Sequence, residues 1–101
     1  MAQIRMSGPT LRVLKCMLDA PRAPRSGAEL SRKLNISSGT LYPLLARLEA
    51  AGWLKSKWEQ IEPSKEARPR RRFYTLTGLG QTSASKELAE LQTSPGVLAW
   101  N

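Results

Sequence analysis

Two short apolar patterns of helical spacing lie only a few residues apart in the middle of the chain. The first places Leu30 and Leu34 on one face. The second places four leucines on one face, namely Leu41, Leu44, Leu45 and Leu48. Because only residues 35–38 separate the patterns, consecutive helices here must cross steeply, with Ile36 of the turn packed between them. This spacing predicts a helix-turn-helix, with the leucines of both helices turned towards the core.

Local sequence signals place the ends of the helices around this turn. Pro9 suits the first turn of a helix over residues 9–20. Ser26 and Glu29 form a capping box, in which each side chain bonds the other residue's amide, and they predict the start of the next helix. Asn35 tolerates the left-handed conformation found at helix ends, so we expect this helix to stop there.

The second helix of the pair is expected to run from a serine cap to Gly52. Ser37 or Ser38 supplies the cap, because either hydroxyl can accept a bond from an amide of the first turn. Pro43 lacks an amide and crowds the carbonyl four residues before it, so we expect it close to the helix start.

Beyond this helix pair the sequence changes to strand-like patterning. Residues 53–59 alternate between two faces and predict a strand. After a polar loop at 60–69, the β-prone segment 70–76 predicts the returning strand of a hairpin. Thr77 then caps a final helix. The expected fold is mainly α with a β-hairpin wing at residues 53–76: a winged helix-turn-helix with a C-terminal dimerisation helix.

A strong positive charge limits the choice of partner. The 101 residues include 16 Lys and Arg against 8 Asp and Glu, a formal net charge of +8. Such a charge favours nucleic acid or an anionic membrane surface. The sequence contains no spanning run of roughly 18 apolar residues and no helix with opposed basic and bulky apolar faces, which disfavours a membrane. The N-terminus lacks the pattern of a secretory signal, so we expect a cytoplasmic protein.

The composition disfavours an enzyme. The chain has no histidine and a single cysteine, Cys16, so neither the usual zinc ligand sets nor a nucleophile activated by imidazole can be assembled. We therefore expect no catalytic residue, no metal and no cofactor. Cys16 falls within the apolar pattern of the first helix, where a buried hydrophobic residue is the simpler interpretation and a redox sensor is the alternative.

The side of the second helix opposite its leucines is available to DNA. In a helix-turn-helix, this helix presents its N-terminal part to base edges in the major groove. The residues predicted to contact DNA from it are Ser37, Ser38, Thr40, Tyr42, Pro43 and Arg47. The alternative role of the serines is capping, and that of Tyr42 is packing on a neighbouring helix.

The wing carries the densest positive charge. Between Lys55 and Arg72 the sequence has seven cationic residues and three acidic ones. Contact with phosphates or the minor groove is predicted for Lys65, Arg68, Arg70 and Arg71. Arg72 is the expected exception, because strand alternation turns it to the same side as Tyr74 and Leu76. The alternative is that the charge run is only a solvated surface.

Three motifs occur in order along the chain: a Leu-Tyr-Pro helix, an Arg-Pro-Arg wing and a Leu-Thr-x-x-Gly entry to the last helix. They lie within the blocks Gly39–Glu49, Arg68–Arg71 and Phe73–Gly80, and a further short block, Gly52–Leu54, stands between the first two. In these motifs the chain resembles the PadR-like family of transcriptional regulators, over about residues 9–92.

The resemblance implies a function as well as a fold. It implies that Thr40, Tyr42 and Pro43 lie in the recognition helix and that the arginines of the Arg-Pro-Arg block belong to the wing. It also implies dimerisation through the C-terminal helix and repression by occupation of a promoter. The sequence departs from the family at Ala67, where many relatives have glycine, so we expect an altered wing turn. Because the C-terminal region is short, the question whether a small-molecule effector binds the protein stays open.

A homodimer is expected because one such domain contacts only a few base pairs, and a two-fold operator requires a symmetric pair. The predicted interface comprises Ala84, Leu88, Leu91, Leu98 and Trp100. The alternative is that the helical part of this stripe covers the chain's own core. The expected division is a DNA-binding domain at 1–76 and a dimerisation helix with its tail at 77–101.

The sequence as a whole predicts a DNA-binding transcriptional regulator, more specifically a homodimeric repressor of a two-fold symmetric operator on double-stranded DNA. Two alternatives stay open. One is a winged-helix module that binds RNA or an acidic protein. The other is an architectural protein that binds DNA without sequence preference.

Overall fold

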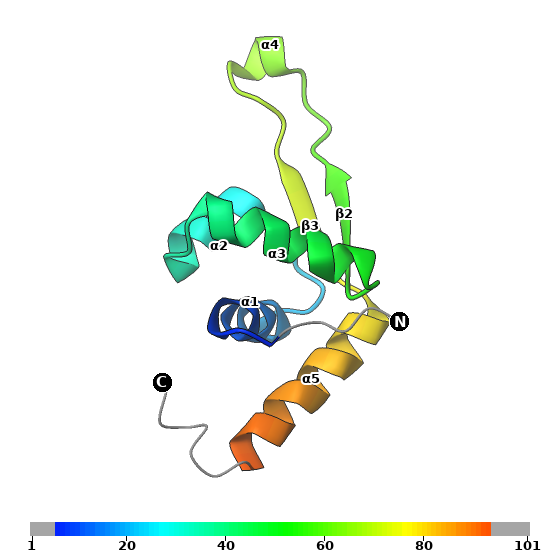
Figure 1. Ribbon diagram of the computed structural model, residues 1–101. Coiled ribbons are helices and arrows are strands. Elements are labelled where there is room, and N and C mark those ends of the chain that lie inside the picture. The colour runs from blue at the N-terminus through cyan, green and yellow to red at the C-terminus, as the bar shows by residue number, and fades with distance from the viewer. Residues whose placement is uncertain (1–5, 94–101) are drawn as a thin grey trace.

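The computed structural model describes residues 6–93 of the chain. Its elements follow the order α1 (Gly8–Asp19), β1 (Arg25–Ser26), α2 (Gly27–Leu34), α3 (Ser38–Ala50), β2 (Leu54–Trp58), α4 (Pro63–Glu66), β3 (Arg72–Leu76) and α5 (Gly78–Thr93). Helices α1, α2 and α3 form a body, from which β2 and β3 project with α4 at the tip (Figure 1). Helix α5 leaves the body in the opposite direction. This arrangement confirms the predicted winged helix-turn-helix.

The turn between α2 and α3 has the predicted form. Helix α2 ends at Asn35, which adopts the left-handed conformation with φ 54° and ψ 47°. Ile36 is only 5% exposed. The leucine row of α3 is 0–2% exposed, as predicted for Leu41, Leu44, Leu45 and Leu48. Burial of four such side chains contributes on the order of 1.5–3 kcal/mol each, so this row fixes which side of α3 remains outside.

Two predicted caps differ from the structure in detail. The Ser26 hydroxyl accepts a bond from the Glu29 amide at 3.0 Å, which confirms half of the capping box. The Glu29 carboxylate accepts from the Arg25 guanidinium at 3.1 Å instead, because a charged donor forms a stronger bond than the neutral amide of Ser26. Ser37 occupies the N-cap position of α3, but its side chain makes no capping bond to an amide.

Pro43 lies inside α3, so its expected position at the helix start was wrong. The helix begins at Ser38, which places the proline in the second turn. The carbonyl that loses its amide partner belongs to Gly39, an exposed residue, so water can bond to it. The helix also ends slightly earlier than expected, at Ala50, and Gly52 takes a left-handed φ of 83° in the turn that follows.

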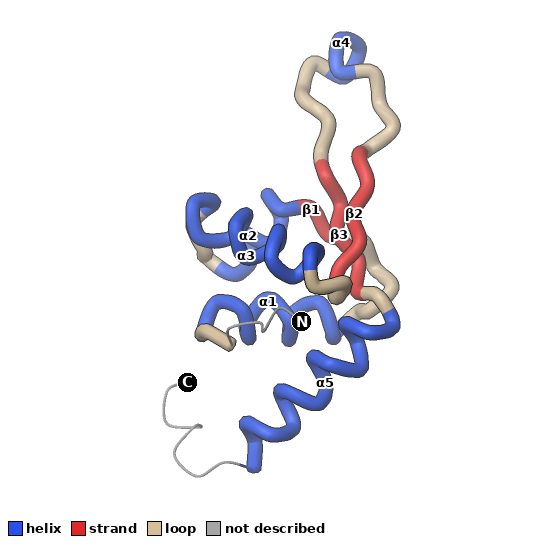
Figure 2. The backbone as a smooth tube through the Cα atoms, turned by 45° about the vertical axis from the view of Figure 1, so that its right-hand side comes forward, coloured by secondary structure: helices blue, strands red, loops and turns tan. Residues whose placement is uncertain are grey.

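The wing is part of a three-stranded antiparallel sheet with the order β1-β3-β2. In the predicted hairpin, Leu54 pairs with Leu76 and Trp58 pairs with Arg72. The additional strand β1 and the short helix α4 were not predicted from the sequence. Just after α4, Ala67 has a φ of 57°, a conformation that favours glycine. Figure 2 shows the three strands together at the base of the wing, beside the helical body.

The junction between the wing and α5 depends on a hydroxyl and a glycine. The Thr77 hydroxyl accepts from the Gly80 amide at 2.9 Å, which confirms Thr77 as the cap of α5. The same hydroxyl lies 2.6 Å from the Gly52 carbonyl, to which it donates. A Cβ at Gly80 would overlap the backbone carbonyl of Trp53. These contacts explain why the Leu-Thr-x-x-Gly block is needed where α5 meets the base of β2.

Candidate nucleic-acid interface

The outer side of α3 is a continuous exposed surface. Every residue predicted to contact DNA from this helix and its cap is exposed, namely Ser37, Ser38, Thr40, Tyr42, Pro43 and Arg47. At the N-terminal end, the Ser37 hydroxyl donates to the Thr40 hydroxyl at 3.2 Å, on the outside of the helix. The surface therefore offers hydroxyl, phenol and guanidinium groups, which are common partners of phosphates and base edges.

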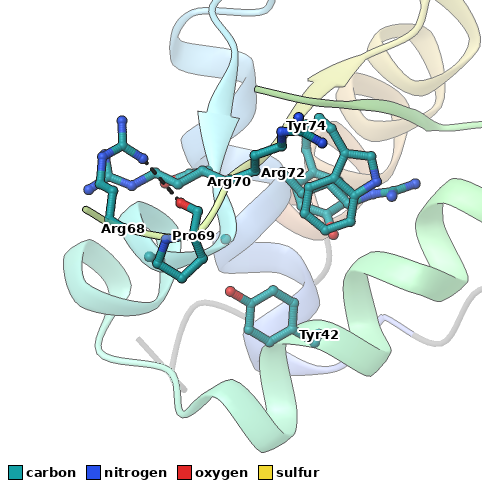
Figure 3. A pocket seen from close by; sticks show the side chains of 11 residues that line it. Tyr42, Arg68, Pro69, Arg70, Arg72 and Tyr74 are labelled. Carbon is teal, nitrogen blue, oxygen red and sulfur yellow. Dashed lines mark hydrogen bonds between the residues drawn. The ribbon is translucent and has the colours of Figure 1, made fainter. Parts of the chain in front are cut away.

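Tyr42 packs against a neighbouring helix and is also exposed to solvent. Its ring packs against Gly27, the first residue of α2, where any side chain would overlap the ring. The residue is nevertheless 44% exposed. In Figure 3 its hydroxyl points towards Pro69, in the segment that carries the wing arginines. The contact with α2 therefore fixes the ring in position and leaves the phenol accessible.

Arg68 is engaged within the wing. Its guanidinium donates two bonds to the Glu59 carboxylate, at 2.7 and 3.0 Å. This pairing lowers the pKa of Glu59 and raises the pKa of Arg68. Glu59 also accepts a bond from the Arg71 amide at 3.3 Å, so the carboxylate ties the two sides of the wing together. Arg68 is consequently less available to a phosphate than the sequence alone indicated.

The other predicted wing cations are on the surface. Arg70 and Arg71 are exposed, and Arg70 donates from its Nε to the Ile61 carbonyl at 3.1 Å. Lys65 is exposed on α4 at the tip of the wing. Of these three residues, Arg70 and Arg71 line the groove described below, and Lys65 does not.

Arg72 is the structural exception that strand alternation predicted. Its Nε donates to the Ser56 hydroxyl at 2.9 Å, and that hydroxyl donates to the Glu49 carboxylate at 2.5 Å. The guanidinium also lies 3.7 Å from the Glu49 carboxylate and 5.1 Å from the centre of the Trp58 ring. Because Glu49 belongs to α3, these bonds connect the wing to the end of that helix.

A groove of about 520 Å³ lies between the wing, α3 and the start of α2. Tyr42, Tyr74 and the wing arginines face it in Figure 3. It is lined by Ser26, Gly27, Ala28, Tyr42, Trp58, Arg68, Pro69, Arg70, Arg71, Arg72 and Tyr74. The groove brings Tyr42 of α3 together with the predicted wing residues Arg68, Arg70 and Arg71. The other predicted contact residues do not line it, namely Ser37, Ser38, Thr40, Pro43, Arg47 and Lys65. Trp58 and Gly27 were not among the predicted site residues. The alternation of side chains along a strand puts Trp58 on the same face of β2 as Leu54.

The predicted dimerisation stripe divides into different environments. Ala84 is fully buried in the chain's own core, so it belongs to the alternative role rather than to an accessible interface. Leu88 and Leu91 are half-buried on the part of α5 that extends beyond the body. Leu98 and Trp100 lie outside the described residues.

Residues 6–93 contain neither a metal site nor a membrane-spanning helix. No group of acidic, cysteine or histidine side chains in this range is arranged to hold a metal ion. None of its helices combines the length and apolar character needed to cross a bilayer. Cys16 of α1 is buried in the hydrophobic core, as its position in the apolar pattern indicated.

Comparison with known proteins identifies a family. A family model described as the transcriptional regulator PadR-like family matches residues 22–86. A PadR-like transcription factor from Bacteroides fragilis is 25% identical, with a TM-score of 0.69 over 82% of this chain and 79% of that one. A PadR family transcriptional regulator from Eggerthella lenta is 29% identical, with a TM-score of 0.65 over 81% and 76%.

A third structure covers more of both chains. This transcriptional regulator from Clostridium thermocellum is 25% identical and has a TM-score of 0.68 over 91% of this chain and 89% of that one. No curated protein matches the sequence.

Proposed function

This chain belongs to the PadR-like family of transcriptional regulators, and on that basis we propose that it is a homodimeric repressor of a two-fold symmetric DNA operator. The observation that carries the proposal is the exposed side of α3, which lies next to a groove lined by Arg70 and Arg71. A helix side with hydroxyl and guanidinium groups suits base edges, and a neighbouring row of arginines suits phosphates.

Two kinds of contact are proposed. Thr40, Tyr42 and Arg47 of α3 enter the major groove, where Thr40 and Arg47 meet base edges and Tyr42 meets a phosphate or a base. Arg70 and Arg71 contact phosphates of the flanking backbone, with Lys65 at the wing tip further along the duplex. Ser37, Ser38, Pro43 and Arg68 complete the proposed contact surface, with Arg68 acting mainly through the position of the wing.

The dimer is proposed to form through α5. The C-terminal half of this helix extends past the body (Figure 2). Leu88 and Leu91 belong to this half and are only half-buried. A symmetric pair joined there would place its two recognition helices in successive major grooves, roughly 34 Å apart. Occupation of such a site within a promoter would exclude polymerase and repress transcription.

A gel-shift series at increasing salt tests the proposal, with a duplex selected from a random pool. Contacts with several phosphates predict a steep linear fall of log affinity with log salt. Arg71→Ala should weaken all duplexes alike and reduce the slope by about 1, whereas Thr40→Ala should act mainly on the selected sequence. Arg22→Ala is the matched control, because this exposed arginine lies beside Gln81 of α5 and does not line the groove.

The alternatives predict different results in the same series. RNA or an acidic peptide that competes better than the duplex would favour the interaction module. Equal affinity for selected and random duplexes would favour an architectural protein. A reporter gene under the selected operator tests repression, and transcription unaffected by the protein would contradict it.

A further inference from the structure

Trp58 is a large apolar side chain that the fold leaves open. It is 55% exposed, although it occupies the same face of β2 as the buried Leu54. The large hydrophobic residues exposed within residues 6–93 are Tyr42, Trp58 and Leu79, and the first two line the same groove. The position of Trp58 in the wing is therefore not explained by packing of the core.

The ring is nevertheless held in a defined position. The Arg72 guanidinium lies over it at 5.1 Å from the ring centre, in the range of a cation–π contact. Arg72 is itself tied to Ser56 of β2 and to Glu49 of α3. The orientation of the ring is thus coupled to the end of the recognition helix, which is the arrangement expected of a preorganised contact residue.

The surroundings of the ring combine apolar surface with positive charge. Besides the main groove, Trp58 borders a second hollow of about 530 Å³ together with Pro63, Pro69 and Arg70. A matching partner must offer apolar groups to the indole and proline rings and anionic groups to the arginines. A DNA strand does this, because apolar faces of deoxyribose alternate with phosphates along its backbone. The same groove is bordered by Tyr42, so a strand leaving α3 would pass along it.

We propose that Trp58 is a DNA-contacting residue whose indole ring packs against a deoxyribose of the strand that Arg70 and Arg71 neutralise. Arg72 is then a positioning residue, which holds the ring and binds no phosphate. This inference rests on the proposed function, because it requires a duplex bound by α3 and the wing.

Tryptophan fluorescence tests the contact directly. The chain has three tryptophans, so Trp53→Phe with Trp100→Phe leaves Trp58 as the only emitter. Titration with the selected duplex, whose binding is followed independently by the anisotropy of a dye on the DNA, should change the Trp58 emission in step with binding. The matched control is Trp58→Phe with Trp100→Phe, which leaves Trp53 at the base of the wing, and its emission should stay constant.

Affinity measurements add a second test. Trp58→Ala should lower duplex affinity about tenfold, the scale of an aromatic contact with a nucleotide, and Trp58→Phe should lower it less. The salt slope should remain that of the unmodified protein, because no charge is removed. Arg72→Met should also leave the slope unchanged while weakening binding, whereas Arg71→Met should reduce the slope by about 1.

The outcomes separate this inference from the function on which it rests. If anisotropy reports binding but Trp58 emission is constant and Trp58→Ala binds normally, the Trp58 contact is overturned and the DNA-binding function stands. If the duplex does not bind at all, both fail. If RNA or a polyglutamate peptide changes the Trp58 emission at lower concentration than the duplex does, the proposed occupant is overturned.

Discussion

Gly27 at the start of α2 lies directly against the ring of Tyr42 in α3: a Cβ at Gly27 would stand 2.5 Å from the ring and 2.7 Å from its hydroxyl oxygen. Contacts this short require the ring to move. The absence of a side chain at Gly27 therefore determines where the phenol of the recognition helix points.

Gly27→Ala is expected to weaken DNA binding more than folding. The overlap falls on the far end of the exposed Tyr42 side chain, which can turn away at little cost to the fold. Displacement of Tyr42 should remove a bond to the DNA of about 1.5 kcal/mol, a loss of roughly tenfold in affinity. Gly8→Ala is the matched control, since a Cβ there meets nothing within 4 Å. Unchanged affinity in Gly27→Ala, with unchanged thermal unfolding, would show that the phenol position does not matter.

Ala67→Gly is expected to stabilise the wing slightly. The left-handed φ of 57° costs an alanine roughly 1–2 kcal/mol, and glycine avoids this cost while losing about 0.4–1 kcal/mol through the freedom of the unfolded chain. Hydrogen exchange of the wing amides should therefore slow. Ala89→Gly, at an exposed position in α5, should instead destabilise the protein by about 1 kcal/mol. Faster exchange in Ala67→Gly would contradict the strain inferred at this turn.

The wing should loosen in acid because of Glu59. The Arg68 guanidinium lowers the pKa of Glu59 below its ordinary value of 4.5. A carboxylate with a lowered pKa stabilises the folded state above its unfolded pKa, and this contribution is lost as the pH falls through the lower, folded pKa. In Glu59→Gln, the stability of the wing should therefore fall less as the pH is lowered. Hydrogen exchange of the wing amides or the chemical shifts of Arg68 measure this.

Glu62→Gln is the control for this pH dependence, because Glu62 is an exposed residue of the same loop. Its acid profile should follow that of the unmodified protein. An identical profile in Glu59→Gln would mean that the Arg68–Glu59 pair does not hold the wing.

Replacement of Leu88 and Leu91 by lysine should convert the proposed dimer into folded monomers. Both side chains are half-buried, so the charges remain in water in the monomer but would be buried in the proposed interface. Sedimentation velocity should show the smaller species, with helical circular dichroism retained. Ala84→Lys should unfold the protein instead, because Ala84 is fully buried in the chain's own core. An unchanged sedimentation coefficient in the double variant would place the interface elsewhere.

The sequence was sufficient where the structure depends on local pattern. The leucine spacing of α3 predicted its buried side, and Asn35 predicted the end of α2, because periodicity and backbone conformation act over a few residues. Strand β1 could not be predicted in this way. It consists of two residues, Arg25 and Ser26, and exists because they pair with Tyr74 and Phe73 of β3, which lie far along the sequence.

The candidate site shows the same limit. The sequence predicted a run of wing arginines, but it could not show that Glu59 lies opposite Arg68 or that Arg72 reaches Glu49 of α3. Those pairings depend on the hairpin register. The helical spacing of Ala84, Leu88 and Leu91 also could not show that Ala84 is fully buried in the chain's own core while the two leucines are only half-buried.

The most direct test of the DNA-binding surface is a photo-crosslink from position 42. A p-benzoylphenylalanine in place of Tyr42 should crosslink to the selected duplex, at a base or backbone position within each half-site. The same group in place of Leu79, an exposed residue of α5, should give no crosslink to DNA. A crosslink from position 42 to a second protein chain, or none to DNA while the duplex is bound, would contradict the account.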